Sequence, residues 1–286
     1  MLTVHNLTYT YPETTTEVLH GLNFTIAEGE IFGFLGPSGA GKSTTQNILI
    51  GLLKEYGGSI TVMGRELRDI GQDYYEHIGV SFELPNHYLK LTARENLNYF
   101  RSLYSGSTRD AMEVLTLVDL ADDADKPVAD FSKGMKIRLN VARSLIHSPR
   151  LLFLDEPTSG LDPVNARRIK DLVLAERARG TTVFVTTHNM TVADELCDRV
   201  AFITNGKIGL IDAPATLKKQ YGKRTVEIAY SNGMPETQSR EFPLSGLGTN
   251  QDFLELLRRY EIETIHTQET TLENIFIHVT GEELAI

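Results

Sequence analysis

One short segment constrains the fold of this chain more than any other. An apolar run, Ile31–Leu35, leads directly into Gly-Pro-Ser-Gly-Ala-Gly-Lys-Ser over residues 36–43. Glycines let the backbone turn its N–H groups toward one point, and a helix that starts after such a turn directs the positive end of its dipole there. The segment therefore predicts a phosphate-binding loop between a buried strand and a helix.

The residues of this loop have separate predicted roles. Lys42 is expected to hold the β and γ phosphates of a nucleotide, and the Ser43 hydroxyl is expected to bind magnesium. The rest of the segment is expected to surround the same phosphates with Gly36, Pro37, Ser38, Gly39, Ala40, Gly41 and Thr44. The alternative is a glycine-rich turn that binds nothing.

A second apolar run, Leu151–Leu154, ends in the carboxylates Asp155 and Glu156. In α/β proteins ligands lie at the sheet edge where parallel strands end, so these groups are expected beside the loop. We predict that Asp155 orients the magnesium ion and that Glu156 is the general base for the attacking water. Read alone, such a pair is a solvated strand end or a helix cap, but the upstream loop favours the functional interpretation.

Apolar periodicity predicts an α/β fold with a parallel sheet. A third buried run lies at Thr182–Val185, and a helical stretch from Asp162-Pro163 to Gly180 separates it from the second run. Strand, helix and strand in that order indicate parallel strands. Alternation over residues 2–9 and 22–26 instead predicts half-buried antiparallel strands before the loop.

The remaining chain divides into a helical insertion and a C-terminal extension. Residues from about 84 to 149 carry helical periodicity, and the hairpin signal Asn205-Gly206 is expected to close the main domain. We therefore predict a P-loop domain over residues 1–220 and a small α+β accessory domain over 221–286. The extension is expected to contain strands at 226–230 and 262–266, a helix at about 250–260, and a last helix with a capping box of Thr270 and Glu273.

Charge and cysteine content exclude several classes of function. The formal net charge is -10 and no run of Lys or Arg offsets it locally, so we expect no nucleic acid partner. The single cysteine, Cys197, cannot form an internal disulfide and is expected to be buried in a protein of a reducing compartment. No histidine pair has zinc-ligand spacing, so magnesium is the only metal expected.

Membrane insertion is not expected of this chain itself. No stretch approaches the ~20 apolar residues of a spanning helix, and the first residues lack the basic and apolar blocks of a signal peptide. A function in transport would therefore need another chain to supply the membrane span.

The order of the motifs resembles that of the ATP-binding subunits of ABC transporters, over at least Leu2 to Pro214. Beyond the loop and the carboxylate pair, the matching positions are Tyr11, Phe82-Glu83, Phe131–Met135, Ser159–Asp162 and His188. This ordered set is more specific than any one of its members.

The resemblance implies further roles in the site. Tyr11 would stack on adenine, and His188 would hydrogen-bond the γ-phosphate. Ser132, at a helix start, would contact ATP held on a second protomer, and Gly134 and Asp162 are likewise expected to bind ATP. The alternatives are a tyrosine that only packs, a capped helix that faces solvent, and a structural histidine.

Two departures from the family pattern matter. Lys133 and Met135 replace the glycine and glutamine more often seen in the signature, whereas Ser132 and Gly134 remain, as they do in a branch of ABC exporters. Glu83 stands where the family has glutamine, so a carboxylate is expected to make the magnesium and water contacts there while adding negative charge near Asp155 and Glu156. The alternative is that Glu83 points into solvent until a partner docks.

By this resemblance the chain is an ATPase that binds ATP and Mg²⁺ and dimerises head to tail with a second nucleotide-binding subunit. The dimer would drive a separate transmembrane permease, with the chain in the cytoplasm on the inner face of the cell membrane. The tail is similar to those of subunits that serve exporters of drugs, peptides or ions. The alternatives are a soluble ABC-type ATPase acting on ribosomes, DNA or a cofactor-assembly scaffold, and a nucleotide-binding regulator without turnover.

Overall fold

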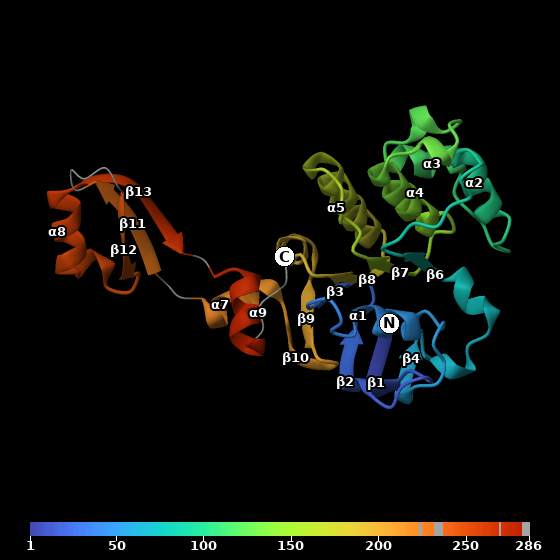
Figure 1. The fold of residues 1–286 in the computed structure, drawn as a ribbon, viewed down its shortest axis with the longest axis horizontal. Helices are drawn as coiled ribbons and strands as arrows, with labels where there is room; N and C mark the ends of the chain where they lie inside the picture. The colour runs from blue at the N-terminus through green and yellow to red at the C-terminus, as the bar shows by residue number, and fades with distance from the viewer. Residues whose placement is uncertain (223–224, 232–236, 269, 282–286) are drawn as a thin grey trace.

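The computed structural model describes residues 1–222, 225–231, 237–268 and 270–281 (Figure 1). The predicted α/β class is confirmed. A mainly parallel sheet lies at the centre, an antiparallel sheet and a group of helices lie to either side of it, and a small sheet unit follows near the C-terminus.

The central sheet has six strands. In spatial order they are β10 (Lys207–Asp212), β9 (Arg199–Thr204), β3 (Ile31–Leu35), β8 (Thr182–Thr187), β7 (Leu151–Asp155) and β6 (Ile78–Ser81). β10 runs antiparallel to its neighbour, and the other pairs are parallel. Asn205 and Gly206 form the predicted hairpin turn before β10, both with positive φ. The predicted parallel sheet is confirmed, although the short strand β6 was not predicted.

Helices follow the strands of this sheet, and the first two of them confirm predictions whereas the last two were not predicted. They are α1 (Lys42–Leu49), α5 (Pro163–Ala178), α6 (Met190–Leu196) and α7 (Pro214–Tyr221). α5 starts where the sequence indicates, because the Asp162 side chain accepts hydrogen bonds from two backbone N–H groups of its first turn and Pro163 occupies its first position.

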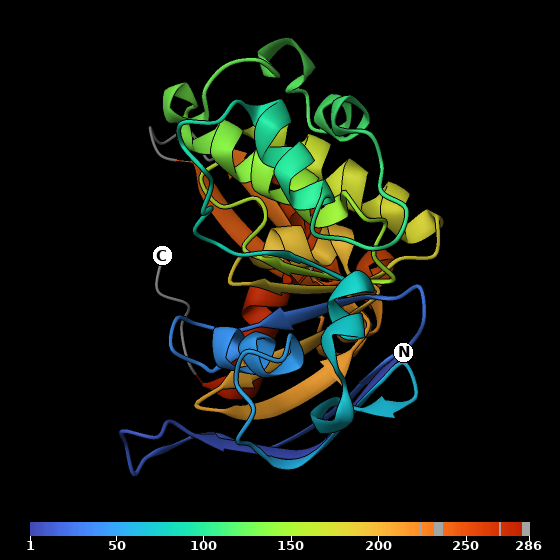
Figure 2. The same ribbon diagram turned by 90° about the vertical axis from the view of Figure 1, so that its right-hand side faces the viewer.

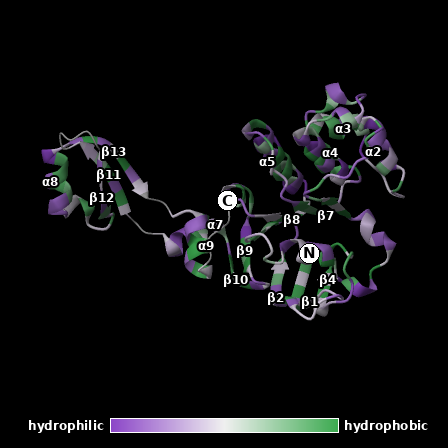
Figure 3. Cartoon of the chain, viewed as in Figure 1, coloured by the Kyte–Doolittle hydropathy of each residue, from purple (hydrophilic) through white to green (hydrophobic). Residues whose placement is uncertain are grey.

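The antiparallel sheet covers one side of the central sheet. Its strands, in spatial order, are β2 (Glu17–Ile26), β1 (Leu2–Thr10), β4 (Gly57–Val62) and β5 (Arg65–Glu66). The ring of Phe24 stacks on Phe32 of β3 with 5.6 Å between the ring centroids, so aromatic packing joins the two sheets. In Figure 3 the strands near the labels β7 and β8 of the central sheet are largely hydrophobic, as their full burial requires.

The predicted helical insertion is confirmed. It consists of α2 (Ala93–Arg101), α3 (Ala111–Leu117) and α4 (Lys133–Leu145), with one-turn helices at Ala121–Asp123 and Val128–Asp130. Other one-turn helices lie at Leu67–Asp69, Gln72–Glu76 and Leu247–Thr249. Figure 2 shows the insertion on one side of the central sheet and the antiparallel sheet on the other.

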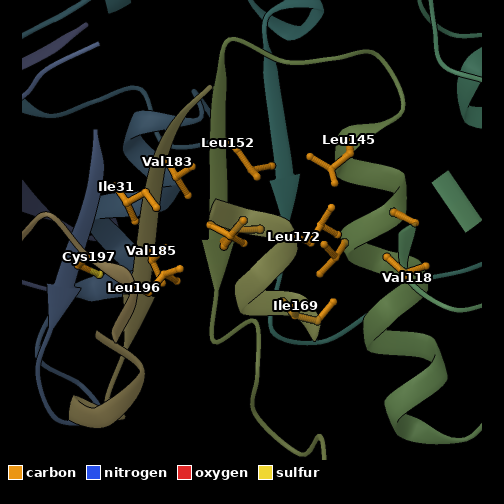
Figure 4. Close-up of a cluster of buried hydrophobic side chains, with 14 of the residues drawn as sticks. Ile31, Val118, Leu145, Leu152, Ile169, Leu172, Val183, Val185, Leu196 and Cys197 are labelled. Atoms are coloured by element: carbon orange, nitrogen blue, oxygen red, sulfur yellow. The ribbon is translucent and has the colours of Figure 1, made fainter. Parts of the chain in front are cut away.

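The insertion and the central sheet share one hydrophobic core. Leu145 of α4 and Ile169 of α5 are fully buried and lie in the same cluster as Leu152 and Val183 of the sheet (Figure 4). Cys197 is buried in this cluster, and burial raises the pKa of its thiol, which confirms its prediction as a small apolar side chain.

A small sheet unit follows α7. It contains the sheet β12 (Gln238–Pro243), β11 (Thr225–Ser231) and β13 (Glu261–Gln268), together with α8 (Gln251–Arg259). Its own core is formed by Val226, Ile228, Phe242, Phe253 and Leu256. The predicted strands and helix of the extension are confirmed, but β12 was not predicted, because only one of its side chains is buried and it ends in a proline.

The last helix, α9 (Leu272–Thr280), does not belong to this unit. Leu272, Ile275 and Phe276 are buried in the core that the central sheet shares, and the ring of Phe276 lies 5.3 Å from that of Phe202 in β9. The prediction that residues 221–286 form one C-terminal domain is therefore wrong for α9, because this helix completes the core of the preceding domain. We call residues 225–268 the C-terminal unit.

The cap of α9 also differs from its prediction by one residue. Thr271, not Thr270, is the N-cap, and its side chain accepts a hydrogen bond from the Asn274 N–H at 3.2 Å. The capping-box pattern favours Thr270, which has Glu273 three residues later, but the packing of Leu272 into the core selects Thr271, which has Asn274 there.

Gly222 and Thr270, which flank the C-terminal unit, lie close together. A Cβ placed on Gly222 would lie 3.8 Å from the Thr270 hydroxyl oxygen. We therefore predict that replacing residues 223–269 by a short glycine linker leaves the thermal unfolding midpoint and ATP affinity close to those of the full chain. Truncation after Gln220 removes α9 as well and is expected to give aggregated protein. Loss of nucleotide binding in both variants would contradict the prediction.

Candidate nucleotide site

The loop after β3 depends on two of its glycines. A Cβ on Gly36 would lie 2.1 Å from the carbonyl oxygen of Ile203 in β9, so no side chain fits at this position. Gly41 has φ of 106° and is the N-cap of α1, a conformation that other residues rarely adopt. Together they hold the first turn of α1 at the end of β3, with its free N–H groups directed to the loop.

Lys42 occupies the centre of this loop. Its ammonium group donates to the carbonyl oxygens of Gly36 at 2.6 Å and Pro37 at 3.0 Å. Burial lowers the pKa of Lys42, while the carboxylates of Glu156 and Asp155 oppose that shift. The side chain is thus held in place by the loop itself, with a positive charge available to phosphate.

One cavity of about 220 Å³ brings the predicted catalytic groups together. It is lined by Ser38, Gly39, Gly41, Lys42, Ser43, Thr44, Glu83, Asp155, Glu156 and His188. These residues come from the ends of β3, β6, β7 and β8, which are neighbours in the sheet. The parallel order of the strands therefore explains why they meet.

Asp155 is a buried carboxylate whose hydrogen-bond partner is neutral. The Thr186 hydroxyl donates to it, and burial raises the pKa of its carboxyl, an effect to which the Glu83 and Glu156 charges add. The Asp155 carboxylate lines the same cavity as the Ser43 hydroxyl, so the two offer oxygen ligands of the kind that a hard divalent cation binds. Such a cation would also offset the buried negative charge of Asp155.

Glu156 is held by three hydrogen bonds. One carboxylate oxygen accepts from the His188 backbone N–H at 2.8 Å and from its ring Nδ1 at 2.6 Å, and the other accepts from the Thr187 hydroxyl at 2.9 Å. Its backbone has φ of 46°, a strained conformation for a residue with a side chain. The surrounding structure thus fixes this carboxylate at the cavity wall.

Sequence patterns did not predict that His188 contacts Glu156, nor that Thr186 and Thr187 bind the two carboxylates. A signal was present, because a fully buried strand that ends in consecutive threonines must hydrogen-bond their hydroxyls internally. The expected contact between His188 and a γ-phosphate remains a prediction.

Glu83 lines the same cavity and is exposed. Its charge is among the causes that raise the pKa of Asp155. The carboxylate is therefore close enough to act on the site electrostatically while remaining in contact with solvent.

Tyr11 lies just beyond β1, and its hydroxyl is 3.0 Å from the Thr44 hydroxyl in α1. The ring is 37% exposed and meets Tyr9 edge to face. The ring is thus partly exposed beside the loop, which leaves it available to stack on a nucleotide base.

The remaining predicted residues lie elsewhere. Ser132 is the N-cap of α4, as expected, and accepts from the Met135 N–H at 3.2 Å. Asp162 caps α5, and its hydrogen bonds lower its pKa. A Cβ on Gly134 would lie 3.4 Å from Leu161, so the signature segment adjoins the loop before α5. None of these residues lines the cavity of Lys42 and Glu156.

Two family models match the chain. The model described as ABC transporter matches residues 19–159, and the model described as fluoroquinolone efflux ABC transporter C-terminal domain matches residues 224–269. A fluoroquinolones export ATP-binding protein of Mycobacterium tuberculosis is 53% identical over 284 residues, which cover 99% of this chain and 94% of that protein. The chain belongs to the ATP-binding subunits of ABC transporters. It is accordingly an ATPase.

Other relatives agree with this assignment. The Nod factor export ATP-binding protein I of Rhizobium johnstonii is 36% identical over 285 residues, covering 93% of this chain and 91% of that protein. Among solved structures, a dimeric post-hydrolysis state of an ATP-binding cassette bound to ADP and Pi has a TM-score of 0.68 at 29% identity, covering 74% of this chain and 98% of that one. Within the described part of this subunit, no helix is long and apolar enough to cross a membrane.

Glu156→Gln is expected to reduce ATP turnover by about 100-fold or more, since the amide keeps the shape of the side chain but cannot accept a proton. ATP affinity should stay within about twofold, because Lys42 and the loop are unchanged. Turnover is measured by phosphate release and affinity by equilibrium titration. Turnover of Glu156→Gln within about tenfold of wild type would show that another group is the base.

The same two assays separate the roles of two further residues. His188→Ala should slow hydrolysis and spare ATP binding, and Lys42→Ala should weaken ATP binding.

Proposed function

We propose that this subunit works as one half of a head-to-tail dimer that closes over two ATP-Mg²⁺ and drives a drug exporter. The observation that carries the proposal is the separation of Ser132 from the cavity of Lys42 and Glu156. Ser132 caps the start of α4, and the start of a helix favours phosphate binding. Within one chain, however, this helix start does not line the cavity of the phosphate loop. A second subunit, turned head to tail, would bring it there.

Within each half-site the residues divide the work of hydrolysis. Lys42 and the loop N–H groups bind the phosphates, and Glu156 accepts the proton of the attacking water. Ser43, Asp155 and Glu83 would hold magnesium, which supplies positive charge to the transferred phosphoryl group. His188, already bonded to Glu156, orients that carboxylate and would contact the γ-phosphate.

The cargo is inferred from relatives along the whole chain. The 53% identical relative is named for fluoroquinolone export, and the C-terminal unit matches a family model described for such exporters. We propose a cargo of fluoroquinolone-like drugs, exported through a permease with this subunit on the cytoplasmic face.

A groove next to the nucleotide cavity is proposed to receive the permease. It has a volume of about 460 Å³ and is lined by rings that include Tyr75, Phe82, Tyr88 and Phe100. Tyr75 and Tyr88 are 45% and 49% exposed, an unusual state for large side chains gathered in one place. Phe82 adjoins Glu83 in sequence, so a partner in this groove would lie beside the magnesium ligands.

Glu83→Gln tests the metal site. We expect turnover to be kept or raised, and the gain to shrink at high magnesium, which offsets the extra charge of the native site. Because the Glu83 charge raises the pKa of Asp155, its removal lowers that pKa and moves the acid limb of the pH–rate profile to lower pH. Glu255→Gln, in the C-terminal unit, is the matched control. A large loss of activity at all magnesium concentrations would mean that the carboxylate itself is required.

Purification of the tagged full chain from membranes tests the transport role. We expect one hydrophobic permease to co-purify, and cells with both proteins to accumulate less of a fluorescent fluoroquinolone than cells with the permease and Lys42→Ala. Equal accumulation would rule out this cargo, and a partnerless soluble pool would rule out the transporter role for this chain.

A further inference from the structure

One arginine in the proposed docking groove is held by neutral groups. Arg143 lies on α4, and its guanidinium carbon is 4.7 Å from the centre of the Phe100 ring. Its Nη1 donates to the Asn86 carbonyl and its Nη2 to the Asn140 side-chain oxygen, both at 2.6 Å. Every one of these partners is uncharged.

Within the described ranges Arg143 makes no ion pair with a carboxylate. The titratable groups that act on it are the phenols of Tyr104 and Tyr88, which are uncharged at neutral pH, and burial lowers the pKa of Arg143. Arg109 offers the contrast, because its guanidinium binds both oxygens of the buried Glu176 at 2.8 and 2.7 Å. A desolvated cation ordinarily has such a partner.

No other side chain lining the groove neutralises this charge. His87 lines the same groove, and burial lowers its pKa to about 4, so its ring is neutral at pH 7. Its Nε2 lies 2.9 Å from the Lys136 carbonyl oxygen, to which it donates. The groove therefore combines aromatic walls with one unbalanced positive charge.

We infer that the permease segment that docks in this groove presents a carboxylate to Arg143. This inference rests on the proposed function, since the permease is the occupant of the groove. A carboxylate can bind the guanidinium while apolar side chains of the same segment pack against Tyr88 and Phe100. The pair would form away from bulk water, where the charge of Arg143 is poorly solvated. Arg143 is thus a specificity residue that rejects permease segments without an acidic group.

The test uses the full chain and its co-purified permease. Arg143→Gln should weaken the complex by about 30-fold or more, as for loss of one member of a buried charge pair. Arg143→Lys, which keeps the charge, should lose clearly less. In a second set of variants, each cytoplasmic Asp or Glu of the permease is changed singly to its amide. One of these changes should weaken the complex as much as Arg143→Gln does, and combining it with Arg143→Gln should weaken the complex no further. Arg150→Gln, an exposed arginine outside the groove, is the matched control.

Two readouts distinguish a docking role of Arg143 from a purely structural one. Both Arg143→Gln and Arg143→Lys lose hydrogen bonds to Asn86 and Asn140, so their unfolding midpoints should fall by similar amounts. Their unstimulated ATPase rates should stay near that of wild type, and only a purely structural arginine would make Lys as harmful to the complex as Gln. The inference is overturned, and the proposed function left intact, if Arg143→Gln does not weaken the complex. The same holds if no change of a permease carboxylate has the effect of Arg143→Gln. Absence of any permease from the wild-type preparation overturns the proposed function, and this inference with it.

Discussion

The site depends on the order in which the parallel strands lie side by side. β7, β8 and β3 are adjacent, with Asp155 opposite Thr186 and Leu35 opposite Thr187. The loop, the carboxylate pair and His188 each follow the end of one of these strands, so a single edge collects them although they are far apart in the chain. The close approach of Gly36 to Ile203 fixes the loop against the same sheet. A change in strand order would separate every group of the site.

Much of this arrangement could be predicted from the sequence. Glycines with a lysine after an apolar run, and Asp-Glu after another, identified the loop and the carboxylates because each depends on local chemistry. Helices were predicted where periodicity and caps agreed, as at Asp162. The short strand β6 and the edge strand β12 were not predicted, since few of their side chains carry an alternating pattern and tertiary pairing decides their state.

Contacts between distant residues were beyond sequence patterns. The bond of His188 to Glu156 depends on the turns after two neighbouring strands, and the positive φ of Glu156 depends on that packing. The assignment of α9 to the main core was missed for a similar reason, because an apolar helix face does not reveal which surface covers it. Arg143 shows the same limit, since the neutral character of its hydrogen-bond partners is visible only in three dimensions.

The position of α9 has a consequence for biosynthesis. The ribosome makes the chain from the N-terminus, and domains generally begin to fold as they emerge. Phe276 fills the core beside Phe202, yet it is synthesised only after the whole C-terminal unit. The nucleotide-binding core therefore stays incomplete, with Phe202 of β9 lacking its cover from α9, while the C-terminal unit is made. Slow or failed folding of that unit would prolong exposure of this apolar surface and leave the nascent chain dependent on chaperones.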